Sequence, residues 1–209
     1  MNYKELLNDS IIVGEFDKID QHHDNRFDHG KKHAENVMNN VIKLANVLGL
    51  GETEINYLCI ACLLHDLGQL GGSENHYLRS KEFAEVYLKD KISKNWLDKI
   101  ILAVENHHEK QNVDNLSLFE HLVLFADKMD FTNKRLDYGY INKAKEECFE
   151  IHIINVDFKV ENDVLSVIIS TDGKIAEKDF VEWDYYPKIL KRIEEFASKL
   201  KLKYSIEIK

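Results

Sequence analysis

The chain has 209 residues, of which 44% are hydrophobic and 31% charged, a balance that excludes a disordered or collagen-like protein. Its formal net charge of −9 argues against general electrostatic binding to nucleic acid or to an anionic membrane. We find no apolar run long enough to span a bilayer and no secretory signal, and three cysteines do not suit a disulfide framework. We therefore expect a cytoplasmic protein.

Helical patterns dominate the first 150 residues. Apolar and small side chains recur at helical spacing from about residue 27 to residue 48, and Gly49 and Gly51 then end the predicted helix. Residues 53–66 are apolar nearly all round, which is typical of a helix buried at the centre of a bundle. A glycine-rich segment, LGQLGG, follows. Further helices are predicted at about residues 73–90, 93–107, 116–129 and 142–149, with Ser73 and Ser93 as caps of the first two.

The sequence period changes after residue 150. Val156, Phe158 and Val160 alternate with polar residues, which predicts a strand, and residues 161–163 resemble a hairpin turn. The remaining predicted elements are a strand at 164–170, an amphipathic helix at 186–202 and a strand at 203–209. We therefore predict a mainly α protein with a helical domain at residues 1–150 and a small α+β extension at residues 151–209. The extension has little core of its own, so it must pack on the helices or on a second subunit.

Histidine and aspartate side chains gather at the ends of the predicted helices. His29 and His33 lie four residues apart on one helix face, and His65 and Asp66 close the apolar helix. The same set includes His76, His107, His108, Asp127 and Asp130. A charged pair at the end of an apolar helix is costly unless something satisfies it, and a divalent metal would do so. Because imidazole and carboxylate ligands suit iron, manganese, zinc, nickel or cobalt, we predict one or two divalent transition-metal ions.

Three short motifs occur in a fixed order along the helical part. They are HAENV around His33, LLHDLG around His65 and Asp66, and FADKMD around Asp127. With this order and these gaps, roughly residues 28–140 resemble the HD-domain metal-dependent phosphohydrolases. The resemblance implies an HD-type helical bundle in which these four residues bind one ion.

The additional histidines imply a second ion. HD proteins with two metals add one histidine after the His-Asp pair and one or two more before the final aspartate, and His76, His107 and His108 stand in those places. Adjacent helical residues point about 100° apart, so the sequence leaves open which of His107 and His108 is a ligand. The resemblance also implies that Asp66 bridges the two ions through its two oxygens.

The subfamily is only partly indicated. The string HHE at residues 107–109 is similar to the HD-GYP cyclic-dinucleotide phosphodiesterases, but Gln69 replaces their lysine and the GYP signature is missing. The diadenosine tetraphosphate hydrolases fit in part. The acidic pair that marks the guanosine tetraphosphate hydrolases after the His-Asp motif is absent. The substrate therefore stays open at this stage.

The predicted catalytic residues are Asp66, Lys128 and Arg135. A hydroxide bound between the two ions would attack the phosphorus, and Lys128 and Arg135 could contact the phosphate.

Four neighbouring residues have open roles. His29 could contact phosphate, orient a ligand or lie on the surface, and Arg79 could contact phosphate or lie on a solvated face. Asp130 or Glu109 could assist proton transfer.

We therefore predict a metal-dependent phosphohydrolase that acts on a phosphate ester or anhydride of a small nucleotide-like substrate. One alternative is a non-catalytic sensor that binds metal and nucleotide and signals through the extension. Another is a di-iron oxygenase of the HD superfamily. The expected partners are a small phosphorylated substrate and, through the edge strands, a second copy in a homodimer. Neither nucleic acid nor a membrane is expected as a partner.

Overall fold

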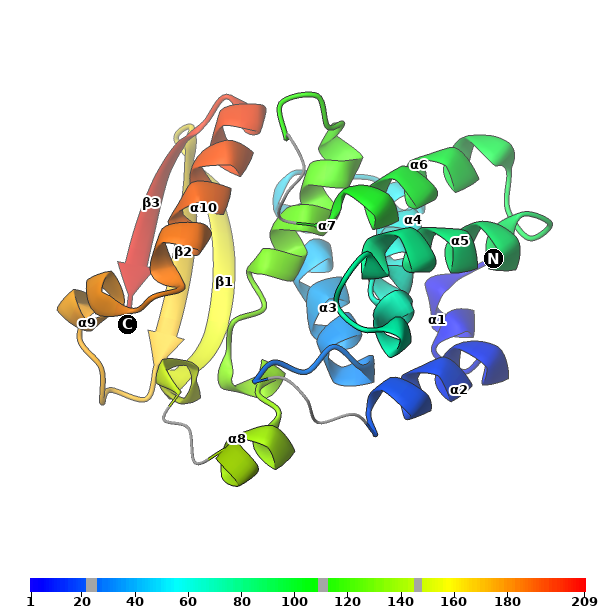
Figure 1. Cartoon of the computed structure of the whole chain (residues 1–209). Helices are drawn as coiled ribbons and strands as arrows, with labels where there is room; N and C mark the ends of the chain where they lie inside the picture. The colour runs from blue at the N-terminus through cyan, green and yellow to red at the C-terminus, as the bar shows by residue number, and fades with distance from the viewer. Residues whose placement is uncertain (22–25, 109–112, 145–147) are drawn as a thin grey trace.

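The structure is a computed structural model that describes residues 1–21, 26–108, 113–144 and 148–209. Helices make up most of it, and a small sheet lies in the C-terminal part (Figure 1). This arrangement confirms the predicted mainly α fold with a C-terminal α+β extension. None of the helices in the described ranges combines the length and the apolar character needed to span a membrane.

The first part of the described chain is a bundle of helices. Its elements are α1 (Tyr3–Leu6), α2 (Ser10–Ile19), α3 (Lys31–Val47), α4 (Glu52–Leu64), the 3-10 helix η1 (Leu67–Gly71), α5 (His76–Leu88), α6 (Lys94–Asn106) and α7 (Leu118–Lys128). The helix α4 packs against α3, α6 and α7, and every residue from Leu58 to Leu64 is buried. Its uniformly apolar sequence therefore corresponds to a central position, as predicted.

Three short helices connect the bundle to the extension, which contains the strands. The connecting helices are η2 (Asn133–Arg135), α8 (Tyr138–Ala144) and η3 (Phe149–His152). The extension consists of β1 (Ile153–Glu161), β2 (Val164–Thr171), α9 (Glu177–Glu182), α10 (Tyr186–Leu200) and β3 (Lys203–Ile208).

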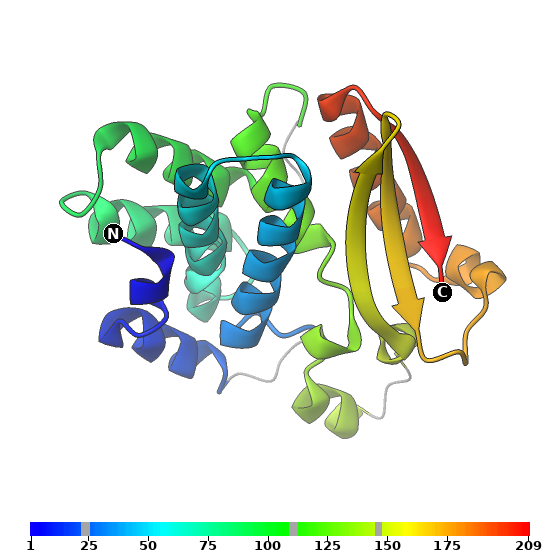
Figure 2. The same cartoon turned by 180° about the vertical axis from the view of Figure 1, so that it is seen from behind.

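The sheet has the strand order β1-β2-β3. The strands β1 and β2 are antiparallel, with Val167 opposite Phe158, and a tight turn joins them. Asn162 and Asp163 occupy that turn with positive φ angles of 49° and 60°, a conformation that these two residue types tolerate well. The strand β3 pairs in parallel with β2, and α10 forms the crossover between them. One face of the sheet is turned to α10, and Figure 2 shows the opposite face.

A shared apolar core joins the sheet to the helical bundle. The ring of Phe125 in α7 stacks on Phe196 of α10 at 4.3 Å between centroids and lies 5.7 Å from Phe158 of β1. All three rings belong to one continuous cluster of buried residues that extends through both parts of the chain. The extension thus packs on the helices, one of the two possibilities that its small core allowed. The domain boundary at residues 150/151 stays a prediction.

Several element boundaries differ from those expected. The helix expected from Ser73 begins at His76, with Asn75 at the N-cap position, so the prediction of a Ser73 cap is wrong. The helix expected at residues 142–149 is replaced by α8, which begins at Tyr138. The helices α1, α2 and α9 were not predicted. The helices α1 and α9 are too short for a clear periodic signal, whereas Ile12, Phe16 and Ile19 of α2 do recur at helical spacing and were missed.

Candidate metal centre

The predicted ligands come from five separate elements and meet at one place. His33 lies in the first turn of α3, His65 caps the end of α4, and Asp66 follows it directly. The remaining members are His76 at the start of α5, His107 at the end of α6 and Asp127 in the last turn of α7. Each of these side chains is buried. Helix ends therefore supply these six side chains.

A close contact of the glycine-rich segment brings α5 to the site. A Cβ atom added at Gly68 in η1 would lie 2.2 Å from the carbonyl oxygen of His76 and 2.6 Å from the backbone nitrogen of Ser80. Only glycine permits this approach of η1 to the first turn of α5. The Ser80 hydroxyl also accepts a hydrogen bond from the Gly68 backbone N–H. The LGQLGG sequence therefore positions His76 beside Asp66.

The imidazoles of His33 and His65 face each other, and their Nε2 atoms lie 3.1 Å apart. His33 Nδ1–H donates to the Asp130 carboxylate at 2.7 Å, and His65 Nδ1–H donates to the Cys62 carbonyl at 2.7 Å. These acceptors assign the hydrogen to Nδ1, so each neutral ring presents a lone pair at Nε2. Two lone pairs at this distance repel each other unless a proton or a metal ion lies between them.

The pKa values of this pair show the same demand for positive charge. Burial by itself lowers the pKa of His33, but hydrogen bonds to the surrounding carboxylates outweigh it and raise the pKa to about 10. Burial lowers the pKa of His65 to about 3. Without metal, a proton on His33 thus offsets the negative charge of the surrounding carboxylates, and His65 stays neutral with a free lone pair at Nε2.

A second pair of imidazoles repeats this arrangement. Nε2 of His76 lies 3.0 Å from Nε2 of His107. His76 Nδ1–H donates to the Ser73 carbonyl at 2.7 Å, and His107 Nδ1–H donates to the Val104 carbonyl at 2.5 Å. Here too the lone pairs at Nε2 converge, because backbone carbonyls hold the hydrogens on the other side of both rings.

Asp66 lies between the two pairs. Its Oδ2 atom is 3.5 Å from Nε2 of His33 and 3.4 Å from Nε2 of His65. Its Oδ1 atom is 3.3 Å from Nε2 of both His76 and His107. Oδ1 is buried and makes no hydrogen bond with any described residue. Burial alone would raise the pKa of Asp66, but the surrounding imidazoles hold it well below its ordinary value. The carboxylate is therefore ionised, with one oxygen facing each pair.

Asp127 joins the first pair, and the two predicted cationic residues accompany it. Its Oδ1 atom lies 3.3 Å from Nε2 of His33 and has no hydrogen-bond partner in the described ranges. Lys128 Nζ lies 2.9 Å from Asp127 Oδ2, and a terminal nitrogen of Arg135 lies 3.7 Å from Oδ1. Burial would raise the pKa of Asp127, but Lys128 and His33 hold it well below its ordinary value. Lys128 and Arg135 thus lie beside a ligand carboxylate.

These groups fit a divalent metal. His33, His65 and Asp127 place one ligand atom each within 4.8 Å of one another, and His65, Asp66 and His107 do the same. The Nε2 lone pairs converge, and Asp66 Oδ1 and Asp127 Oδ1 make no hydrogen bond with a described residue. All of these atoms can donate electron pairs to a metal cation. Nitrogen and carboxylate donors together suit a transition metal such as zinc, manganese or iron.

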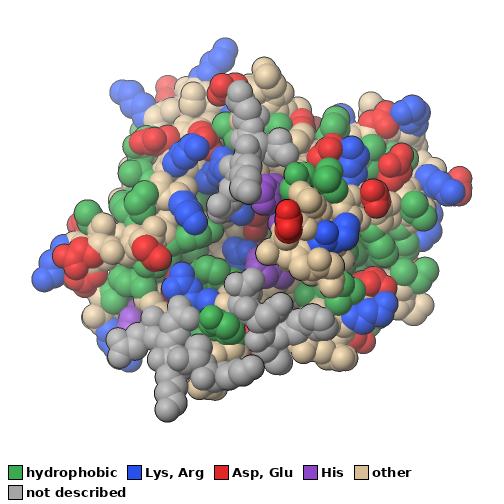
Figure 3. Space-filling model, viewed as in Figure 1, with side chains coloured by type: hydrophobic (Ala, Val, Ile, Leu, Met, Phe, Trp, Pro, Cys, Tyr) green, Lys and Arg blue, Asp and Glu red, His purple; other side chains and the backbone are tan. Residues whose placement is uncertain are grey.

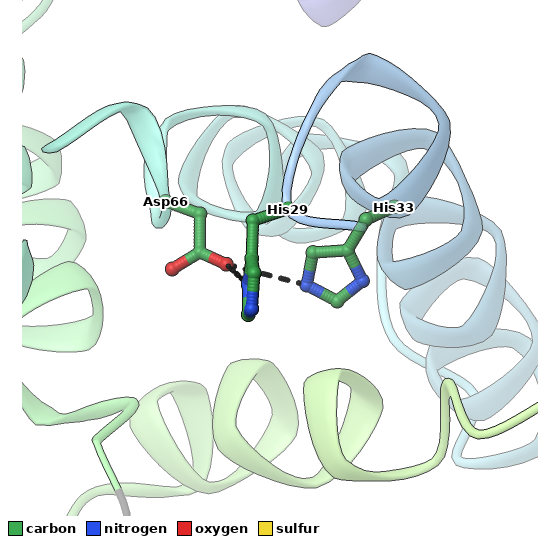
Figure 4. A group of neighbouring side chains, drawn as sticks. All are labelled: His29, His33 and Asp66. Carbon is green, nitrogen blue, oxygen red and sulfur yellow. Dashed lines mark hydrogen bonds and ion pairs between the residues drawn. The ribbon is translucent and has the colours of Figure 1, made fainter. Parts of the chain in front are cut away.

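His29 belongs to this centre, although the sequence left its role open. Figure 4 shows His29 and His33 turned toward the carboxylate of Asp66. His29 Nδ1 lies 2.9 Å from Asp66 Oδ2, so the ring is placed to orient the carboxylate. Burial lowers the pKa of His29. His29 is partly exposed at the pocket and also contacts Asp66, so it is more than a plain surface residue.

A pocket of about 490 Å³ opens onto the centre. Figure 3 shows histidine side chains in a hollow on this face of the molecule. The lining includes Lys128 and Arg135, and the ring of His108 stacks on Tyr77 at 4.9 Å between centroids. His108 therefore lies on the pocket wall, while His107 contributes its nitrogen to the buried pair. Tyr77 was not singled out, because an isolated tyrosine in a helix carries no motif.

Arg79 takes a different place from the one considered. Its guanidinium donates to the carbonyls of Gly68 and Glu74 at 2.8 Å each, and also to that of Gly72. The side chain therefore holds the glycine-rich segment, and the hypothesis of a phosphate contact by Arg79 is wrong. Glu109 lies outside the described residues.

The segment that carries the candidate ligands matches a known protein family. The HD domain family matches residues 31–132, which include the candidate ligands from His33 to Asp127. The chain is 25% identical over 150 residues to the uncharacterized protein MJ1020 of Methanocaldococcus jannaschii. That match covers 61% of this chain and 56% of the relative, so the chain spans about half the length of the curated protein it matches.

A solved structure is also similar to this chain. It is a predicted HD superfamily hydrolase from an uncultured Thermotogales bacterium, with 18% sequence identity and a TM-score of 0.48. The match covers 69% of this chain and 90% of that one.

Proposed function

We propose that the chain is a metal-dependent phosphohydrolase of the HD-domain superfamily, whose family model matches residues 31–132. Its substrate would be a phosphate ester or anhydride of a small nucleotide-like molecule. The observation that carries this proposal is the position of Asp66 between two pairs of converging imidazole lone pairs. One carboxylate oxygen for each pair is the arrangement that two adjacent ions require.

Each ligand has a defined task in this proposal. His33, His65 and Asp127 would hold one ion, His76 and His107 the other, and Asp66 both. When bound, two divalent ions supply Lewis acidity and activate water for attack on phosphorus. Asp130 keeps the His33 ring oriented through its hydrogen bond to Nδ1.

Two cations of the chain would position the phosphate. Lys128 and Arg135 both line the pocket, and each lies next to Asp127. Their charges favour the additional negative charge that develops on the phosphate oxygens during the reaction. This supports a substrate whose reacting group is a phosphate.

The aromatic wall supports a nucleotide. Tyr77 and His108, whose rings stack on each other, both line the pocket, and a nucleobase can stack on an aromatic ring.

Metal analysis with a substrate panel tests the proposal. The purified protein is expected to contain transition metal and to release phosphate from one class of nucleotide, while Asp66→Ala loses both the metal and the activity. Metal content is measured by mass spectrometry, and turnover is measured under nitrogen and in air to separate hydrolysis from oxygenase chemistry. Full metal occupancy and activity in Asp66→Ala would contradict the assignment, and nucleotide binding without turnover would favour a sensor.

A further inference from the structure

A second group of cationic side chains lies beside the metal pocket, on the C-terminal extension. It surrounds a cleft of about 100 Å³, which we call the α10 cleft. Its lining residues are Lys128, Tyr185, Lys188, Ile189, Lys191 and Arg192. Lys128 also lines the metal pocket, so the two cavities share a wall. Figure 3 shows Lys and Arg side chains gathered over α10, next to the hollow in which the histidines are visible.

The α10 cleft concentrates like charge in an acidic protein. Four of its six lining residues are cationic and, among the described residues that line it, none is acidic, although the whole chain carries a net charge of −9. Lys128 pairs with Asp127 and Arg192 pairs with Glu195, so the surplus positive charge of the cleft comes chiefly from Lys188 and Lys191. A bound anion would be attracted to that surplus charge. The charge distribution therefore indicates an anion site.

The packing of α10 gives the cleft a fixed shape. Ile189, Ile193 and Phe196 are buried in the shared core, and Phe196 stacks on Phe125 of α7. This contact places the first turns of α10 beside Lys128 at the end of α7. Lys188, Lys191 and Arg192 are three and four residues apart, so they share one helix face.

One member of the cleft is buried and two are exposed. Arg192 is buried, and its guanidinium donates to Glu195 at 2.6 Å. Lys188 and Lys191 are exposed, and Lys191 Nζ lies 3.7 Å from Glu195. Lys188 Nζ lies over the Tyr185 ring at 5.2 Å from its centroid. Two exposed ammonium groups therefore lie beside a buried guanidinium, where they could contact a bound anion.

We propose that the α10 cleft binds a second phosphate group of the substrate while the first phosphate occupies the metal pocket. This inference rests on the proposed function, because it assumes that the metal pocket receives a phosphate. A cleft of about 100 Å³ lined by cationic side chains has room for one phosphate group. The substrate class is therefore a compound with at least two phosphates, such as a nucleoside diphosphate, triphosphate or bisphosphate.

Charge-removing variants test the cleft by equilibrium binding. Lys188→Gln/Lys191→Gln removes two exposed charges, and Lys159→Gln/Lys174→Gln is a matched control elsewhere on the extension. Calorimetry measures the affinity of the purified, metal-loaded protein for orthophosphate and for pyrophosphate, both supplied as magnesium complexes. The cleft variant is expected to lose about tenfold or more in affinity for pyrophosphate and less than about threefold for orthophosphate. The control is expected to keep both affinities. An equal loss for both anions, or no loss, would overturn the proposal.

Competition distinguishes a substrate phosphate from a separate free anion. If the second phosphate belongs to the substrate, pyrophosphate displaces orthophosphate and binds at one equivalent per chain. Simultaneous binding of both anions would overturn this and indicate an independent anion site.

Binding without turnover separates this inference from the proposed function. If Lys188→Gln/Lys191→Gln releases phosphate normally and its preference for pyrophosphate over orthophosphate is unchanged, the cleft proposal is wrong and the proposed function stands. If the variant loses that preference while the wild type hydrolyses no substrate of the panel, the result supports the cleft as an anion site and contradicts the proposed function.

Discussion

At the scale of single residues, the centre depends on carboxylates that are buried and remain charged. Asp127 is the clearest case, because Lys128 and His33 keep its pKa well below the ordinary value despite burial. Metal binding would add a further counter-charge at Oδ1, which makes no hydrogen bond within the described ranges. The stability of the protein should therefore depend on metal through this residue.

Before chelation, the free metal concentration is set at roughly 100 to 1,000 times the dissociation constant. Removing the metal with a chelator is then expected to lower the free energy of unfolding of the wild type by about 3–4 kcal/mol. Asp127→Asn keeps the shape but removes a ligand charge, so its chelator-induced shift should be smaller. Its metal-free form should also be less stable than the metal-free wild type, because Lys128 and Arg135 then face an uncharged amide. Thermal unfolding with and without chelator measures both effects, with exposed Asp90→Asn as the control. Equal chelator shifts in Asp127→Asn and the wild type would mean that Asp127 is not a ligand.

A second residue-scale prediction concerns pH. His121 is buried in α7, its Nε2–H donates to the Val113 carbonyl at 2.9 Å, and burial lowers its pKa. Because the unfolded chain then binds a proton more readily than the folded one, this stability is present above about pH 6.5 and is lost as pH falls. The wild type should therefore lose more stability than His121→Gln between pH 7.5 and pH 5, as urea unfolding would show. A parallel loss in both proteins would contradict this.

At the scale of elements, the second half of the centre exists because three chain segments converge on Asp66. The segment η1 approaches α5 through Gly68, which brings His76 to the site, and the end of α6 brings His107. Backbone carbonyls at the ends of these segments orient both rings. Removing the two rings should leave the first half of the centre intact, because His33 and His65 are held by other elements.

We therefore expect the wild type to bind two metal equivalents at saturation and His76→Ala/His107→Ala to bind one. His108→Ala serves as the matched control and should keep two, because its ring stacks on Tyr77 outside the buried pair. Metal titration followed by mass spectrometry counts the ions. A wild type that saturates at one equivalent would restrict the centre to a single ion.

At the scale of the whole molecule, the extension and the helical bundle share one core. Phe125, Phe158 and Phe196 form the junction, and all are buried. The same junction holds α10 beside the metal pocket. Two parts that bury their apolar surface against each other should unfold together.

Each part contains one tryptophan that can report its unfolding. Trp96 lies in α6, where it stacks on Tyr57, and Trp183 is buried in the extension. In Trp96→Phe and Trp183→Phe proteins, the two fluorescence transitions should coincide on thermal or urea unfolding. Phe196→Ala should lower the stability reported by both by about 3–5 kcal/mol, whereas Val181→Ala on the surface should have little effect. An earlier transition at Trp183 would show that the extension unfolds independently.

The sequence by itself determined the mainly α class, the buried central helix, the hairpin and the set of candidate metal ligands. These features are readable because helical and strand periodicities are local, and because the motifs around His33, Asp66 and Asp127 have characteristic residues and spacing. The N-cap of α5 was misplaced, since Asn75 takes a left-handed conformation that no local pattern announces.

Only the tertiary structure decided how distant segments meet. It placed His107 rather than His108 in the buried pair, turned His29 to Asp66, and assigned Arg79 to the glycine-rich segment. It also paired β3 in parallel with β2 and set the cationic face of α10 beside Lys128. These contacts join residues far apart in the chain. They depend on which buried surfaces pack together, and periodicity within one segment carries no information about its packing partner.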